Sequence, residues 1–187
     1  MTNKPNVTKI LGMLLIILFS NNYLNAQENF SEKKAGNVIY LSMPNYLLKT
    51  NTLNDSAILQ YMNASKEAYV IVIDDSKAEL ESLGSKYESI SDFHYSTSKK
   101  LIEGLKNAKE TNKKTFKIGT SNYSQSLLTG LFTSSSGTEI GISYLLTYIE
   151  TSEHYYQILC WSTKEFYASL ESDFAKISTS LKEGNCK

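Results

Sequence analysis

The sequence contains no arginine, and this absence narrows the classes of partner that the protein can bind. All nineteen basic residues are lysines, and nineteen acidic residues balance them to a formal net charge of zero at pH 7. Arginine is the side chain that makes bidentate contacts with phosphate and with guanine edges, and it also stacks on bases. Without arginine, a basic run or a net positive charge, the chain is not expected to bind nucleic acid.

Signature motifs of common enzymes are also absent. The sequence has no Gly-x-Ser-x-Gly elbow, no Gly-x-Gly-x-x-Gly loop and no P-loop. Its two histidines, His94 and His154, lack a second metal ligand at His-x-x-x-His or Cys-x-x-Cys spacing. We expect both to be surface residues. The sequence therefore predicts no metal site, no cofactor and no enzymatic activity.

A few polar groups remain as weaker candidates for chemistry. Asp74 and Asp75 end an expected strand ahead of a helix, where they suit a Ca²⁺ site or a catalytic acid, but acids there also stabilise a helix N-terminus. The serine-rich segment Ser134–Gly137 could bind an anion through its backbone, and the alternative is a solvated hairpin tip. Cys160 as a nucleophile needs a nearby histidine, and His154 lies about 20 Å away along the same extended strand. In each case we favour a purely structural role for these residues over a chemical one.

Only two cysteines occur, Cys160 and Cys186. A disulfide needs Cα atoms within about 7 Å of each other. The helix expected after Cys160 runs to about Lys182, a rise of about 30 Å, which places Cys186 beyond its far end. We expect Cys160 to be a buried small hydrophobe and Cys186 to be a tail thiol; the alternative is a disulfide between them.

Residues 1–26 have the order of a signal peptide. Lys4 and Lys9 precede a short apolar run, Ile10–Phe19, and a polar stretch then ends at the small residue of Leu24–Ala26. Ten helical residues rise only about 15 Å, about half of a bilayer core, which disfavours the alternative of an uncleaved anchor. No later segment is apolar for long enough to span a membrane. We therefore expect an exported protein, periplasmic or secreted.

The remainder is expected to form one α+β domain over residues 37–187, after a flexible polar leader at 27–36. Hairpins are indicated by turn-like connections between paired apolar segments. His154–Trp161 is apolar on both faces, which predicts a central strand. Lys113 and Lys114 precede a further strand. The other expected strands are 37–42, 57–62, 68–73, 123–133 and 139–150.

Three helices are indicated by their caps and apolar spacing. Ser76 opens a capping box for a short helix that Gly84 ends. Ser91 is the expected N-cap of a longer helix. A second capping box, Ser162–Glu165, opens a helix that Gly184 closes. The apolar stripe of the middle helix is Phe93, Thr97, Leu101, Leu105 and Ala108, and that of the last helix is Phe166, Leu170, Phe174, Ile177 and Leu181.

Several local patterns accompany this order of elements: Met43-Pro44 with Tyr46, Leu59-Gln60-Tyr61, Glu67–Val72 and Tyr155–Leu159. Together they resemble the PsbP-like superfamily. That superfamily includes the photosystem II extrinsic protein, periplasmic DcrB-type lipoproteins and a Ran-binding nuclear import factor. The resemblance covers 37–183. It implies a central antiparallel sheet with helices on both faces, as in an α/β/α sandwich.

The resemblance also implies a non-enzymatic accessory domain that docks onto a larger assembly, here an envelope protein. Thirteen tyrosines either satisfy strand preferences or supply a contact surface. The candidate contacts outside the clear strand core are Tyr46, Tyr87, Tyr95 and Tyr123. The alternative is a small-ligand carrier or an exported enzyme with a pocket between sheet and helices. A stress or damage response protein of the envelope is not separable from the accessory domain by sequence.

Overall fold

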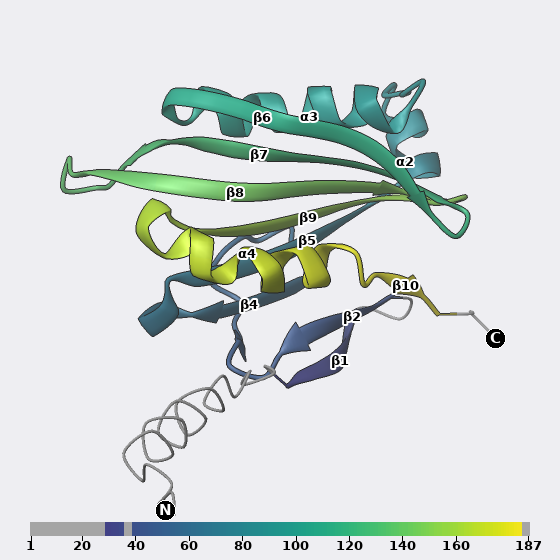
Figure 1. Ribbon diagram of the computed structural model, residues 1–187. Coiled ribbons are helices and arrows are strands. Elements are labelled where there is room, and N and C mark those ends of the chain that lie inside the picture. The colour runs from purple at the N-terminus through teal and green to yellow at the C-terminus, as the bar shows by residue number, and fades with distance from the viewer. Residues whose placement is uncertain (1–28, 36–38, 185–187) are drawn as a thin grey trace, which may run out of the picture.

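A long antiparallel sheet organises the protein. The computed structural model describes residues 29–35 and 39–184 (Figure 1). Within them, seven strands pair in the order β3-β4-β5-β9-β8-β7-β6. The strands are β3 (Leu48–Lys49), β4 (Leu59–Asn63), β5 (Ala68–Ser76), β6 (Lys106–Ile118), β7 (Ser121–Thr133), β8 (Glu139–Glu150) and β9 (His154–Thr163). The helices are the 3-10 turn η1 (Ala64–Lys66), α2 (Lys77–Ser82), α3 (Ile90–Glu103) and α4 (Lys164–Ser178). The protein is thus α+β and mostly strand.

A smaller sheet joins the two ends of the described chain. Its order is β1 (Phe30–Ala35), β2 (Ile39–Pro44) and β10 (Lys182–Glu183). A flexible leader was expected over 27–36, but Phe30–Ala35 pairs along its whole length with Ile39–Pro44. The burial of Ala35 and of Ile39 in the core gives this pairing its anchor. The expected signal peptide and Cys186 lie outside the described residues.

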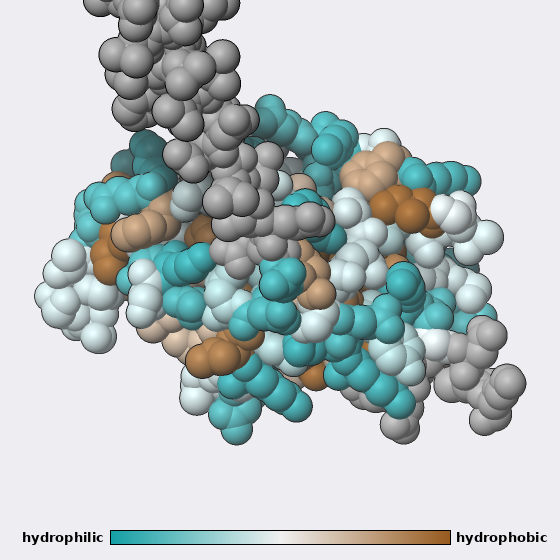
Figure 2. All heavy atoms as spheres, turned by 60° about the horizontal axis from the view of Figure 1, so that its bottom comes forward, coloured by the Kyte–Doolittle hydropathy of each residue, from teal (hydrophilic) through white to brown (hydrophobic). Residues whose placement is uncertain are grey.

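The surface around this smaller sheet is mostly hydrophilic. Figure 2 brings the bottom of Figure 1, where β1 and β2 lie, toward the viewer, and hydrophobic residues there form small separate patches. Among the described helices, none is long and apolar enough to cross a bilayer.

Strand β9 is central, as its apolar faces predicted, and it contributes to two hydrophobic clusters. Tyr156, Ile158 and Cys160 are buried in one cluster with residues of α4. Tyr155, and beside it Leu159, belong to the other cluster with residues of α3. Because neighbouring strand residues point in opposite directions, the alternation assigns the clusters to opposite sides of β9. Cys160 is fully buried, as expected, and burial raises the pKa of its thiol.

The expected hairpins of the large sheet are confirmed, including the one that joins β8 to β9. Strand β4 pairs with β5, and β7 pairs with β8 in continuous register from Asn122↔Glu150 to Thr133↔Glu139. Strand β6 is longer than expected, because the lysine-rich segment from Lys106 onward pairs with β7 through two irregularities in register. The sequence did not indicate a strand here because the segment is polar. An edge strand, however, does not need an apolar face over its full length.

Helix α3 begins two residues earlier than expected. Ser89, not Ser91, is the N-cap, and its hydroxyl accepts a hydrogen bond from the backbone N–H of Asp92 at 3.2 Å. The helix ends at Glu103, so Leu105 and Ala108 of the expected stripe lie outside it. Pairing of the following residues with β7 stops the helix, and the apolar spacing continues across its end by coincidence.

Helix α4 is shorter than expected, and its first turn differs from a capping box. Thr163 is the N-cap but makes no side-chain cap hydrogen bond. The helix ends at Ser178 rather than near Lys182, and the Ser180 hydroxyl accepts from the backbone N–H of Ser42 at 2.9 Å. Phe166 is 44% exposed, whereas Tyr167 takes the buried position.

The two phenylalanines of α4 provide a test of this packing. Phe174 is fully buried in the cluster beneath α4, so Phe174→Ala should lower the free energy of unfolding by about 3–5 kcal/mol. Phe166→Ala removes the same atoms from an exposed position and should cost less than about 1 kcal/mol. Urea denaturation measures both, and equal losses would contradict the placement of Phe166.

Candidate functional site

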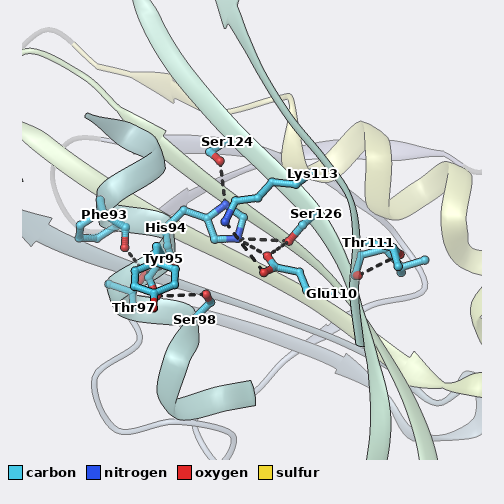
Figure 3. Close-up of polar contacts among 11 residues, drawn as sticks. Phe93, His94, Tyr95, Thr97, Ser98, Glu110, Thr111, Lys113, Ser124 and Ser126 are labelled. Atoms are coloured by element: carbon cyan, nitrogen blue, oxygen red, sulfur yellow. Dashed lines mark hydrogen bonds and ion pairs between the residues drawn. The ribbon is translucent and has the colours of Figure 1, made fainter. Parts of the chain in front are cut away.

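A buried polar cluster connects α3 to strands β6 and β7. Figure 3 shows His94 pointing from α3 toward Ser124, Ser126 and Glu110. His94 Nδ1 lies 2.7 Å from Ser124 Oγ, and Nε2 lies 2.8 Å from Glu110 Oε1 and 3.2 Å from Ser126 Oγ. The Ser126 hydroxyl donates to the same carboxylate oxygen at 2.6 Å. His94 was expected on the surface, but its side chain is fully buried.

Burial decides the protonation state of this histidine. Desolvation, with the positive charge of Lys113 nearby, lowers the pKa of His94 to about 4, although the Glu110 carboxylate acts in the opposite direction. The ring is therefore neutral at pH 7. A tautomer with its proton on Nε2 satisfies the geometry, because Nε2 then donates to Glu110 and Nδ1 accepts from the Ser124 hydroxyl.

The order Glu110–His94–Ser124 is that of a relay that activates a serine nucleophile. A nucleophile must reach a substrate, however, and both His94 and Ser124 have no exposed surface. Neither residue lines the groove beside Phe166 or the groove between α4 and β6. The ring instead packs on Tyr148 at 4.3 Å between centroids. The cluster satisfies buried polar groups and fixes α3 on the sheet.

Part of this cluster could be predicted from the spacing of residues in the sequence. His94 follows the buried Ile90 by four residues, which places it on the apolar side of the helix. Ser124 and Ser126 are two residues apart and so share one face of β7. Glu110 lies on β6, and the sequence did not indicate the full length of this strand. The pairing of β6 with β7 brings Glu110 close to His94.

The second histidine and the paired aspartates form cross-strand contacts. His154 Nδ1 lies 2.7 Å from Asp74 Oδ1, and the Gln157 amide donates to Asp75 Oδ2 at 2.8 Å. Burial is the main cause that raises the pKa of Asp75. Both aspartates lie within β5 and pair with β9. Within the described ranges no three His, Cys, Asp or Glu residues gather as metal ligands do.

The four candidate tyrosines do not form one surface. Tyr46 is partly buried and donates to Asp173 at 2.9 Å. Tyr87, also partly buried, packs edge-on against the ring of Phe93. Tyr123 is only 1% exposed, so its expected place on the surface is wrong. Tyr95 is 68% exposed and is the one member of the four that is mostly accessible to solvent.

A different set of side chains forms an exposed apolar surface. Phe132 and Ile140 are direct partners across β7 and β8, and Ile140 lines a groove of about 440 Å³ together with Phe166. The three are 46%, 37% and 44% exposed, respectively. We call them the Phe166 surface. Sequence reasoning missed it because it assigned Phe166 to the core stripe of α4.

Acidic residues surround this surface. Glu67, Glu139 and Glu165 line the groove, against one lysine, Lys164. Glu139 is paired with Lys106 at 2.7 Å. Ser162 Oγ and Thr163 Oγ1, at the start of α4, are buried without a hydrogen-bond partner. The groove thus combines apolar walls with an excess of negative charge.

Known structures share the fold of this chain. The solution structure of cyanobacterial PsbP from Synechocystis sp. PCC 6803 superposes with a TM-score of 0.61 at 11% identity, covering 88% of this chain and 98% of the other. The Ran-binding protein Mog1p of Saccharomyces cerevisiae gives 0.55 at 12% identity, covering 83% and 96%. The protein therefore has the PsbP-like fold, as the sequence resemblance indicated. Identities this low establish the fold alone.

Comparisons of sequence give no further relatives. No protein-family model matches the chain, and no curated protein matches it.

The buried histidine predicts a dependence of stability on pH. Because the folded-state pKa of His94 is about 4 and the unfolded value is about 6.5, the unfolded state binds more protons between these values. The contribution of His94 to the free energy of unfolding is therefore almost fully present above pH 6.5, and it falls as the pH decreases toward 4. From pH 7 to pH 5 the contribution of His94 should fall by about 2 kcal/mol.

Urea unfolding at both pH values measures this change. His94→Gln should reduce the loss on acidification, whereas the matched variant His154→Gln should retain it, since His154 does not contact the cluster. An unchanged pH dependence in His94→Gln would contradict the assigned protonation state.

Proposed function

We propose that the protein is an exported, non-enzymatic accessory domain that docks onto a protein of the cell envelope through the Phe166 surface. The observation that carries the proposal is the grouping of three exposed apolar side chains, Phe132, Ile140 and Phe166, beside one groove. Exposed apolar groups that adjoin one another are typical of contact sites, whereas scattered ones need no explanation.

The charges around the surface indicate the chemistry of the partner. Glu67, Glu139 and Glu165 complement lysine or arginine side chains around an apolar anchor. We therefore propose a partner that inserts an apolar or aromatic side chain beside Phe166 and places basic groups at the rim. Tyr95 is retained as a separate candidate contact because it is exposed.

The PsbP-like fold supports an accessory role. We propose that helices flank both faces of the sheet, as in an α/β/α sandwich, and the alternating cluster membership along β9 supports this arrangement. The closed His94 cluster supports the absence of enzymatic activity, since its only serine in relay order is buried. A small-ligand carrier is a second candidate, and it depends on a different groove, between α4 and β6.

A cross-linking pull-down with the tagged protein from the source organism tests the docking role. We expect the wild type to enrich one envelope protein reproducibly. Ile140→Ser with Phe166→Ser should reduce that enrichment at least about tenfold, because the central anchors of an interface carry most of its affinity. Leu83→Ser is the matched control, since Leu83 is 74% exposed at the end of α2.

Two results of the pull-down would count against the proposal. Recovery of the bait alone at good yield would exclude stable docking as the main role. Full enrichment by the double variant would place the contact elsewhere. Circular dichroism should be unchanged in all variants, because each replaced side chain is at least partly exposed.

Export has its own test. Cleavage after Ala26 should leave Gln27 as the new N-terminus, and mass spectrometry of protein from the periplasm or medium detects it. Replacing Leu14 and Leu15 with lysines interrupts the apolar run and should retain the protein, uncleaved, in the cytoplasm. Full-length protein in the wild-type cytoplasm alone would exclude an exported role.

A further inference from the structure

A second groove lies on the other side of the structure from the His94 cluster. It occupies about 560 Å³ between α4 and the edge of the sheet formed by β6 and β7. Lys114 and Phe116 contribute from β6, Gln125 from β7, and Ala175 and Lys176 from α4. This groove shares no residue with the Phe166 surface.

The charge in this groove has one sign. Lys114 and Lys176 line it, and no carboxylate does. Neither ammonium forms an ion pair with a described residue. Two lysines elsewhere differ in this respect: Lys77 of α2 pairs with Glu150 at 2.9 Å, and Lys106 of β6 pairs with Glu139 at 2.7 Å. The groove therefore has a local excess of positive charge that an anion would complement.

An apolar floor lies beside these ammonium groups. Phe116 is partly buried and stacks on Tyr123 with 5.1 Å between ring centroids, which holds its ring in place. Lys114 Nζ lies 5.5 Å from the centre of the Phe116 ring. Ala175 forms the opposite wall on α4 and leaves space there because its side chain is small. Apolar and cationic surface thus meet within one site.

The polar part of the floor is held in position. Gln125 is 6% exposed, and its amide nitrogen donates to Thr147 Oγ1 at 2.9 Å and to Ser178 Oγ at 3.2 Å. These contacts join β7 to β8 and to the end of α4. The groove is therefore supported by a fixed hydrogen-bonded layer, which favours a formed site over a transient one.

The direction of α4 works against an anion, but the lysines outweigh it. The C-terminal end of a helix carries roughly half a negative elementary charge, compared with two full charges on Lys114 and Lys176. The carbonyl oxygen of Ala175 also already accepts the hydroxyl groups of Ser178 at 3.1 Å and Thr179 at 2.8 Å. These bonds reduce the negative potential that the helix end presents.

We propose that this groove binds a small amphipathic organic anion, a carboxylate with an apolar tail. The carboxylate contacts Lys114 and Lys176, and the tail packs on Phe116 and Ala175. The assignment rests on charge complementarity beside an apolar floor, and it goes beyond the docking function because it involves a separate surface and a different class of partner.

Titration with sodium decanoate, followed by ¹H–¹⁵N NMR, tests the proposal. We expect saturable shifts of the amides of Lys114, Phe116, Gln125 and Lys176. Lys114→Glu with Lys176→Glu should weaken binding at least about tenfold, since it replaces both attractive charges with repulsive ones. Lys49→Glu with Lys86→Glu is the matched control, because it changes the net charge equally at exposed lysines outside the groove.

Three further probes separate the contributions to binding. Inorganic phosphate tests the charge without the tail and should bind more weakly than decanoate. Decyltrimethylammonium tests the tail with the opposite charge and should leave the groove amides unshifted. Vesicles of phosphatidylglycerol test whether the anion must belong to a lipid surface, and they should not be required.

Several results would overturn the proposal. These are an absence of groove shifts with decanoate, equal binding of decanoate and decyltrimethylammonium, or decanoate binding that survives the Lys114→Glu and Lys176→Glu changes. Phosphate binding as tight as that of decanoate would remove the role of the apolar floor. Binding to anionic vesicles alone would assign the groove to a membrane surface.

Discussion

The burial of β9 on both sides is the constraint on which the rest of the structure depends. Its residues alternate between the cluster under α4 and the cluster under α3, so neither helix packs independently of this strand. Strands β5 and β8 hydrogen-bond to its two edges along most of its length. A shift of one residue in either register would exchange the two sets of side chains, placing tyrosines and leucines where the opposite cluster is already filled.

Around this strand, the polar groups are used mainly to position elements. The neutral His94 ring, Ser124 and Glu110 join α3 to the outer strands, and Gln125 joins β7 to the end of α4 from the opposite face. Such groups would be costly if left unpaired, so they favour one placement of each helix over alternatives. What remains for function lies on the exterior. The Phe166 surface and the groove beside Lys114 differ in the sign of their surrounding charge, which suits them to different partners.

Several elements followed from local pattern. The hairpin between β7 and β8 was predicted closely because turn residues separate two long apolar strands, and α2 because Ser76 supplies its N-cap hydrogen bond. The first turn of α4 was not, because Thr163 remains paired with Ile142 at the end of β9 and its side chain does not cap the helix. Most of strand β6 was not predicted, because the lysine-rich part nearest α3 does not alternate between apolar and polar residues.

The sequence by itself determined the central position of β9 and the burial of Cys160, because apolar spacing and capping residues act over a few neighbours along the chain. The PsbP-like fold class came from the resemblance of the sequence to that superfamily. Only the tertiary structure decided that His94 is buried and neutral, that Tyr123 is in the core and that Phe166 faces solvent. Each of these depends on strands or helices distant in the sequence: Glu110 on β6 contacts His94 on α3, and Ile140 on β8 lines the same groove as Phe166 on α4. Because these side-chain environments depend on such long-range pairing, the local spacing of apolar residues along the sequence does not predict them.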